Sequence, residues 1–390
     1  MPVPSLRFSF RRIAALFVLA LIGAAVWFFL IRDDDSGGGS VEPETNEEPE
    51  RAAREPVSDD PVVRRMTVKE QIEQVLMFGF EGTAPSAPGV AELAESDVGA
   101  VVVRSENWTG ADAGKKLVAA LSSSDGIPPL IATSQEGGEF RALPDLPPEA
   151  RALDIAREGE PNAVTEWANA ASEALVGAGF HLNLFPVADV ASLDSPLAGR
   201  AFSDDPDQVA SLTEGALEGC EDAGLACAPL HFPGLGSASQ DTAQGPATVV
   251  TDLATLNARD LVPFRAVSRD APAMVISLGL YPDFDAVVPG ALTEGVATGL
   301  LRAEVGFRGV AISDDLGSPA VTGTYPVPEA AIRALAAGID LVQVGSPEDA
   351  DGVAKAIKTA VEDGTLDPER LAQAAERVIE LKREVGLIDN

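Results

Sequence analysis

Short apolar runs recur eight times along the chain after residue 66. The runs are VLMFGF (75–80), VGAVVV (98–103), PLIAT (129–133), FHLNLFPV (180–187), LACAPLHF (225–232), AMVISLG (273–279), GVAISDD (309–315) and IDLVQVG (339–345). Most are apolar at consecutive positions, a pattern typical of parallel strands that are buried on both faces. The runs therefore predict eight buried strands.

The segments between these runs have helical spacing, and several of them end in glycine, as helices often do. Clear examples are 205–224, 293–306 and 328–338, and an Asp-capped amphipathic helix is predicted at 367–387. Strands that alternate with helices in this way predict an α/β fold, a (β/α)8 TIM-type barrel. A doubly wound open sheet is the alternative, but no glycine-rich phosphate loop follows the first run.

The first 62 residues do not share this alternation. Residues 13–31 form an uncharged apolar run that is long enough to cross a bilayer as a helix, and Arg11 and Arg12 precede it. A cleaved signal peptide has a shorter apolar centre followed by small residues, and a run this apolar at a chain start is a poor match for a buried core helix. The positive charge ahead of the run places the residues behind it outside the cytoplasm.

The predicted organisation therefore has four parts. These are a short cytoplasmic N-terminus (1–12), a transmembrane anchor (13–31), a disordered acidic linker (32–62) and the barrel domain (63–390). The predicted localisation is the cell membrane, crossed once by the anchor, with the barrel domain extracytoplasmic.

The composition narrows the range of partners. A formal net charge of −33 argues against nucleic acid or anionic lipid as a ligand, because phosphate binding needs a basic surface. The only two cysteines, Cys220 and Cys227, are too few and too close together for a metal site. Whether they form a disulfide is left open by the sequence.

Polar residues gather where the predicted strands end. In a barrel of this kind the chemistry lies at the carboxyl ends of the strands. The residues at these ends are Ser134, Gln135, Glu136, Asn183, Asp189, His231, the loop GLGSASQD (234–241), Asp314 and Asp315. Several carboxylates are thus predicted to face one mouth, and two carboxyl groups about 5 Å apart are the usual equipment of a retaining glycosidase.

Several sequence blocks carry a family resemblance. They are MTVKEQIEQVLMFGFEG, IATSQEGG, NLFPVADV, GRAFSDDPDQV, HFPGLG and LLRAEVGFRGVAISDDL, in that order. From about residue 66 to 387 the chain resembles the single-domain β-N-acetylhexosaminidases of glycoside hydrolase family 3. The resemblance implies a TIM-type barrel, a carbohydrate substrate or ligand, and hydrolysis of β-linked glycans, including cell-wall glycans that contain N-acetylglucosamine.

The same resemblance implies roles for individual residues. Asp314, the first Asp of SDD, matches the family's nucleophile, which forms a covalent glycosyl-enzyme in a retaining mechanism. Arg200 and His231 match positions that bind the sugar, and Asp241 matches the Asp of the family's acid/base pair, D-x-H. No cofactor and no metal are implied.

The chain departs from the family pattern at four polar positions. Ala243 stands where the family has the proton-donating His, Leu230 replaces a Lys, Ser134 an Asp, and Glu139 an Arg. General acid catalysis typically contributes about 10²–10⁴-fold, so its loss slows a reaction without abolishing it. Two hypotheses follow: a glycosidase with weakened acid/base catalysis, in which Asp241 itself acts as the acid, or a catalytically impaired pseudoenzyme that binds glycan or a surface partner.

Overall fold

Eight parallel strands lie at the centre of the computed structural model, within the residues that it describes: 58, 60–123, 126–158, 162–345 and 350–389. They are β1 (Leu76–Phe78), β2 (Ala100–Val102), β3 (Leu130–Thr133), β4 (Leu182–Asn183), β5 (Ala226–Cys227), β6 (Ala273–Ile276), β7 (Val310–Ser313) and β8 (Val342–Val344). Each lies inside one of the eight predicted runs, and all of their residues are buried. The predicted strands are confirmed.

The strands close into a ring. Hydrogen bonds link them in the order β5-β4-β3-β2-β1-β8, and β6 pairs with β7. Two parallel bridges connect these sheets: Phe232, after β5, pairs with Ile276, and Ile312 pairs with Leu341, just before β8. A closed ring of parallel strands is a TIM-like barrel, so the predicted fold is confirmed and the open doubly wound sheet is excluded.

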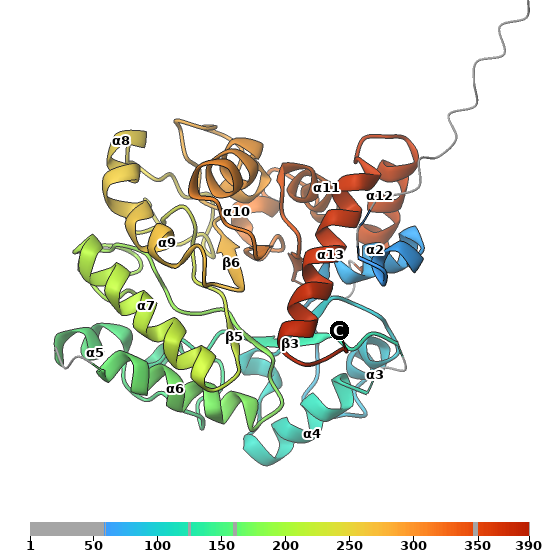
Figure 1. Ribbon diagram of the computed structural model, residues 1–390, viewed down its shortest axis with the longest axis horizontal. Coiled ribbons are helices and arrows are strands. Elements are labelled where there is room, and N and C mark those ends of the chain that lie inside the picture. Colours follow the sequence, from blue (N-terminus) through green and yellow to red (C-terminus); the bar gives the residue numbers. More distant parts are fainter. Residues whose placement is uncertain (1–57, 59, 124–125, 159–161, 346–349, 390) are drawn as a thin grey trace, which may run out of the picture. The chain divides into compact units, whose positions relative to one another are not determined.

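Helices surround this ring (Figure 1). The α-helices are α2 (Val68–Gln74), α3 (Pro88–Ala94), α4 (Ala111–Leu121), α5 (Ala152–Glu158), α6 (Ala163–Val176), α7 (Pro206–Asp222), α8 (Leu253–Thr255), α9 (Leu261–Val267), α10 (Pro319–Thr322), α11 (Val327–Ala337), α12 (Ala350–Glu362) and α13 (Pro368–Glu384). The π-helical segments are η4 (Leu256–Asp260) and η6 (Gly295–Val305), and the 3-10 turns are η1 (Val63–Arg65), η2 (Ser105–Asn107), η3 (Gly138–Phe140) and η5 (Gly290–Leu292).

The C-terminal helix α13 shows how the sequence sets one of these elements. The carboxylate of Asp367 accepts the N–H of Glu369 and so caps the helix, and Pro368 occupies its first position. One face of α13 is buried, and the helix packs against α2, α11 and η1. The predicted capped, amphipathic helix is confirmed.

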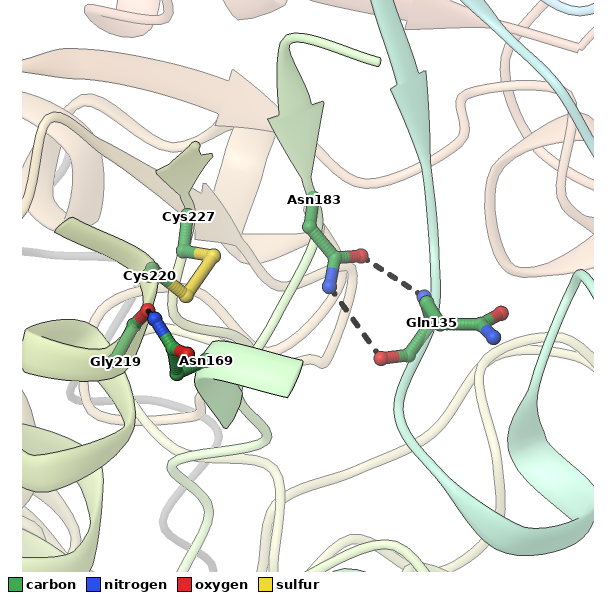
Figure 2. The surroundings of a disulfide bond; sticks show 6 residues. All are labelled: Gln135, Asn169, Asn183, Gly219, Cys220 and Cys227. Atoms are coloured by element: carbon green, nitrogen blue, oxygen red, sulfur yellow. Dashed lines mark hydrogen bonds between the residues drawn. A yellow bond between two sulfur atoms is a disulfide. The ribbon is translucent and has the colours of Figure 1, made fainter. Parts of the chain in front are cut away.

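A disulfide joins Cys220, in the last turn of α7, to Cys227 in β5 (Figure 2). Beside it, the amide of Asn169 on α6 donates to the carbonyl oxygen of Gly219 at 3.3 Å and holds α6 against α7. The disulfide answers the question that the sequence left open. Because it closes a loop with a sequence separation of only 7 residues, it removes less entropy from the unfolded chain than a disulfide across a long loop would.

The predicted localisation requires correction. In the ranges that the structure describes, no helix is long and apolar enough to cross a membrane. This finding overturns the assignment as a single-pass protein of the cell membrane with an extracytoplasmic barrel, and with it the predicted membrane contact. The segments 1–12 and 13–31 on which that assignment depended lie outside the described residues.

The predicted linker 32–62 also lies outside the described residues, apart from 58 and 60–62. Ser58 Oγ donates to the carboxylate of Glu376 on α13 at 3.1 Å, and Asp60 pairs with Arg383 at 2.6 Å. The described contacts of the barrel therefore begin before residue 63, and the boundary at 63 stays a prediction.

Candidate active site

A cavity of about 500 Å³ opens at the carboxyl ends of the strands. Its lining includes Arg200, His231, Asp241, Ala243 and Asp314. A neighbouring cavity of about 410 Å³ shares Arg200, His231 and Asp314 with it, so the two are lobes of one hollow. The structure thus brings the four predicted site residues, Asp314, Asp241, Arg200 and His231, to a single place.

Asp314 directly follows β7, and its backbone N–H donates to Ile276 of β6 at 3.0 Å. Its Oδ1 accepts the N–H of Asp315 at 2.8 Å. Within the described part of the chain, Oδ2 of Asp314 has no hydrogen-bond partner. The side chain is therefore held at one oxygen and open to the cavity at the other, as an attacking carboxylate must be.

Asp315 has a different environment, although it is the next residue. Its Oδ2 accepts from Arg104 at 2.7 Å, and its Oδ1 accepts the N–H of Gly317 at 2.9 Å. Burial raises the pKa of Asp315, the charge of Arg104 opposes this, and the charge of Asp314 adds to it. With both oxygens engaged, Asp315 stabilises the turn that follows β7.

Arg200 is fixed by two hydrogen bonds to one carboxylate. Its Nε and Nη2 donate to the two oxygens of Glu136, each at 2.7 Å, and Ser134 Oγ donates to the same carboxylate at 3.1 Å. Burial disfavours the charged guanidinium, but the charge of Glu136, the hydrogen bonds to it and the charges of Asp241 and Asp189 together outweigh burial and raise the pKa of Arg200. This bidentate pair holds a permanent positive charge at the cavity wall.

His231 is oriented by a buried carboxylate. Asp189, which is 0% exposed, accepts from His231 Nδ1 at 2.7 Å and from its backbone N–H at 3.2 Å. Burial lowers the pKa of His231, but the charge of Asp189 and the hydrogen bond to it outweigh burial and raise the pKa. With the proton on Nδ1, Nε2 faces the cavity 3.4 Å from Arg200 Nη2.

The loop that carries Asp241, residues 234–249, covers one side of the cavity and is here called the Asp241 loop. Its arms pair with each other: Ala238 and Val249 form an antiparallel bridge, and Ser239 N–H donates to Thr248 at 2.9 Å. At the tip, Asp241 Oδ1 accepts the N–H of Ala243 at 2.8 Å. Asp241 Oδ2 lies 3.9 Å from Arg200 Nη1.

The first residues of this loop are fixed by contacts with residues outside the loop. Gly234 has a φ of 126°, and a Cβ there would lie 2.6 Å from the Cβ of Asp260, so only glycine fits. The hydroxyl of Tyr281 donates to the carbonyl oxygen of Gly234 at 3.1 Å, and Leu235 N–H donates to Asp189. One carboxylate, Asp189, therefore orients both His231 and the start of the loop.

Two further polar residues, Asn183 in β4 and His181 just before it, do not line either lobe of the cavity. Asn183 makes two hydrogen bonds to the backbone of Gln135, at 2.9 and 3.3 Å, which join the ends of β3 and β4 (Figure 2). His181 precedes β4 at the opposite end of the barrel, and its Nδ1 accepts from Ile131 N–H at 3.0 Å.

Three of the positions that depart from the family pattern line the smaller lobe. They are Ser134, Glu139 and Leu230. Leu230 is 5% exposed and lies among the apolar residues Val102, Leu184 and Val275 in this lining. The lobe therefore has an apolar patch at the position where a cation was expected.

Two cavity residues, Arg104 and Gln343, were not predicted. Arg104 comes directly after the run 98–103, so the rule of searching the carboxyl ends of strands identifies it once it is applied there. Gln343 lies inside β8, where one polar residue among apolar ones was the only signal. Among the described residues there is no group of three or more His, Cys, Asp or Glu side chains that could hold a metal ion.

Comparisons with known proteins identify the family of this chain. Residues 67–381 match the glycosyl hydrolase family 3 N-terminal domain. A β-hexosaminidase of Xylella fastidiosa is 34% identical over 291 residues, which cover 70% of this chain and 84% of that protein. The chain belongs to glycosyl hydrolase family 3. It is a glycoside hydrolase.

The chain is also similar in structure to solved glycoside hydrolases. A family 3 β-N-acetylglucosaminidase from a Paenibacillus species is 29% identical, with a TM-score of 0.77 over 83% of this chain and 64% of that one. The chain thus spans slightly less than two thirds of that protein. A β-N-acetylhexosaminidase from Beutenbergia cavernae is 27% identical, with a TM-score of 0.72 over 82% of this chain and 99% of that one.

Proposed function

We propose that this glycosidase hydrolyses β-linked glycans that contain N-acetylglucosamine, by a retaining mechanism in which Asp314 is the nucleophile. The observation that carries the proposal is the oxygen of Asp314 that lies open to the cavity beside Arg200 and His231. The substrate class is supported by the names of the relatives, β-hexosaminidase and β-N-acetylglucosaminidase.

In the first step Asp314 attacks the anomeric carbon, the glycosidic bond breaks, and the leaving oxygen takes a proton. The resulting glycosyl ester is then hydrolysed by water, which gives up a proton, and the free carboxylate returns. His231 Nε2 and the Arg200 guanidinium are positioned to hydrogen-bond the sugar. A sugar that binds there replaces water at polar groups that are costly to leave unpaired.

We assign the proton transfers to Asp241, the carboxylate at the tip of the Asp241 loop. It lines the cavity, and it is the cavity carboxylate that does not belong to the segment directly after β7. Its Oδ2 lies 3.9 Å from Arg200 Nη1, and the neighbouring position 243 holds Ala where the resemblance implies a proton-donating His. Proton donation is therefore the weak step, and activated leaving groups are favoured.

The test is to trap the intermediate. The protein is incubated with a fluorinated N-acetylglucosaminyl fluoride, which forms the glycosyl-enzyme quickly and releases it slowly, and is then analysed by peptide mass spectrometry. One sugar on the peptide that contains Asp314 is expected. Asp314→Asn should prevent labelling, whereas the control Asp315→Asn, which keeps the shape of the neighbouring turn, should retain it.

Binding of N-acetylglucosamine without any covalent label would instead support the catalytically impaired, glycan-binding alternative. A label on another carboxylate would remove Asp314 from the role of nucleophile.

A further inference from the structure

The tip of the Asp241 loop is tied to the loop after β7 by one hydrogen bond. Ser318 Oγ donates to the carbonyl oxygen of Thr242 at 2.7 Å. Thr242 lies between Asp241 and Ala243 and is 4% exposed, and Ser318 lies just beyond Asp314 in the same loop. Among the residues that the structure describes, no other residue from outside the loop hydrogen-bonds the tip, 241–245.

Ser318 itself is firmly placed on the barrel. Its backbone N–H donates to the carbonyl oxygen of Asp315 at 2.9 Å, and its Oγ accepts the N–H of Ala320 at 3.3 Å as the N-cap of α10. The arms of the Asp241 loop bond to each other at Ser239 and Thr248, and the second arm also bonds to the barrel at Leu280, so that the tip is the part of the loop with the fewest outside contacts. Besides the ion pair of Asp241 with Arg200 at 3.9 Å, the tip is therefore held in place by the Ser318 hydroxyl.

We propose that Ser318 is a positioning residue, whose hydroxyl holds the Asp241 loop closed over Asp314. The consequence for catalysis, that Asp241 stays beside the glycosidic oxygen, rests on the proposed acid/base role of Asp241. One side chain on the nucleophile's own loop thereby sets the distance between the two carboxylates of the reaction.

Two substitutions separate this role from the capping of α10. Ser318→Asp keeps an acceptor for the Ala320 N–H, because Asp is a good N-cap, but it loses the donor and turns a negative charge towards the Thr242 carbonyl oxygen. Ser318→Thr keeps both the donor and the cap. The pair therefore differs in the bond to Thr242 while α10 remains capped in both.

The first measurement is hydrogen exchange of the folded protein, which needs no substrate. Loss of one hydrogen bond of ordinary strength shifts an opening equilibrium about five- to tenfold, so exchange of the peptide 237–249 should rise about fivefold or more in Ser318→Asp. Exchange in Ser318→Thr, and in α10 of both variants, should match the parent protein. Unchanged exchange of 237–249 in Ser318→Asp, or an equal rise in both variants, overturns the proposal.

The second measurement is kcat/KM for aryl glycosides of N-acetylglucosamine with leaving groups of increasing basicity. Ser318→Asp should lose about tenfold on the most basic leaving group and less than about twofold on a nitrophenol, which needs no proton. Ser318→Thr should restore the parent dependence. Faster exchange with an unchanged dependence on the leaving group upholds the role of Ser318 in closing the loop and instead overturns the acid/base role of Asp241.

Discussion

The two histidines of the chain lie at opposite ends of the barrel, and their pKa values shift in opposite directions. At the carboxyl ends, burial lowers the pKa of His231, but the charge of Asp189 and the hydrogen bond to it together outweigh burial and raise the pKa. At the amino ends, burial and then the nearby charge of Lys382 lower the pKa of His181 to about 4. The environment at the carboxyl ends thus favours a charged imidazole, and the environment at the amino ends favours a neutral one.

The charged clusters at the two ends differ in the same way. Before β8, Asp340 is 0% exposed and accepts from Arg302, Arg370 and Arg377 and from the N–H of Ala311. This Asp340 cluster uses both oxygens of the carboxylate and joins α13 and η6 to the barrel. At the mouth, by contrast, an oxygen of Asp314 faces a cavity. Saturated polar groups stabilise the fold, and groups left open to a cavity are available for chemistry.

The largest expected effect is a loss of turnover when the cavity at the carboxyl ends of the strands is altered. Asp314→Asn keeps the acceptor for the Asp315 N–H but removes the proposed nucleophile, so kcat should fall by about 10⁴-fold or more. Steady-state rates on a nitrophenyl glycoside measure the loss. The temperature of unfolding should stay within about 2 °C of the parent, since surface-like changes at open positions cost little. Retained activity would show that another carboxylate attacks.

At the amino ends of the strands, the expected effect of a substitution is a loss of stability. Asp340→Asn leaves three buried or half-buried arginines without their carboxylate, and breaking such a buried cluster costs about 3–5 kcal/mol. Urea unfolding measures the change. The kcat of the molecules that remain folded should match the parent. A variant that loses activity while keeping its stability would contradict the division between the two ends.

A smaller gain is expected at the tip of the Asp241 loop. Ala243→His places an imidazole beside Asp241 in the cavity, and its pKa lies near the working pH. Turnover of an unactivated disaccharide should rise about 10²-fold, equivalent to about 2.7 kcal/mol of barrier. Ala243→Gln, similar in polarity but without a titrating group, should give no gain, and Asp314→Ala in the Ala243→His background should abolish it. An Ala243→His protein that stays folded but shows no gain would mean that the site lacks more than its acid.

The smallest effect, when it is expressed per pH unit, is a dependence of stability on pH that originates at Lys382. This fully buried lysine donates to Gln74 at 2.6 Å, and burial lowers its pKa from 10.5 to about 7. The unfolded chain therefore binds a proton that the folded chain does not between pH 7 and 10.5. Stability should rise with pH in this window, by at most about 1.4 kcal/mol per unit.

Lys382→Met is the matched variant for that measurement. The difference in the free energy of unfolding between the two proteins, determined at several pH values from 7 to 10.5, removes contributions from all other groups. A difference that does not change with pH would mean that the lysine stays protonated in the folded protein.

Much of the fold was predictable because it depends on local pattern. Buried strands need consecutive apolar residues, and each of the eight strands lies within such a run. Even Lys382 follows the pattern, since it lies four residues after Val378, on the buried stripe of α13. The closure of the ring was not determined by alternation alone, because it depends on the pairing of β1 with β8, which are far apart in the sequence.

For the site, the sequence predicted which residues belong to it but not which residues they contact. The rule that chemistry lies at the carboxyl ends of strands selected Asp314, His231 and Asp241, but it did not predict their partners. The bidentate contact of Arg200 with Glu136 joins residues 64 positions apart, and the Ser318 contact with Thr242 joins residues 76 apart. Such pairings depend on backbone geometry in three dimensions.

The paired arms of the Asp241 loop also bear on how this enzyme can change over evolutionary time. Because the arms bond to each other, the few residues of the tip form a unit that can be replaced while the strands keep their register. Ala243 is exposed within that unit, so under the proposed mechanism a substitution there would alter proton transfer at small cost to folding. A lineage can therefore lose or regain its proton donor by one substitution, and new leaving-group preferences can be selected without redesign of the barrel.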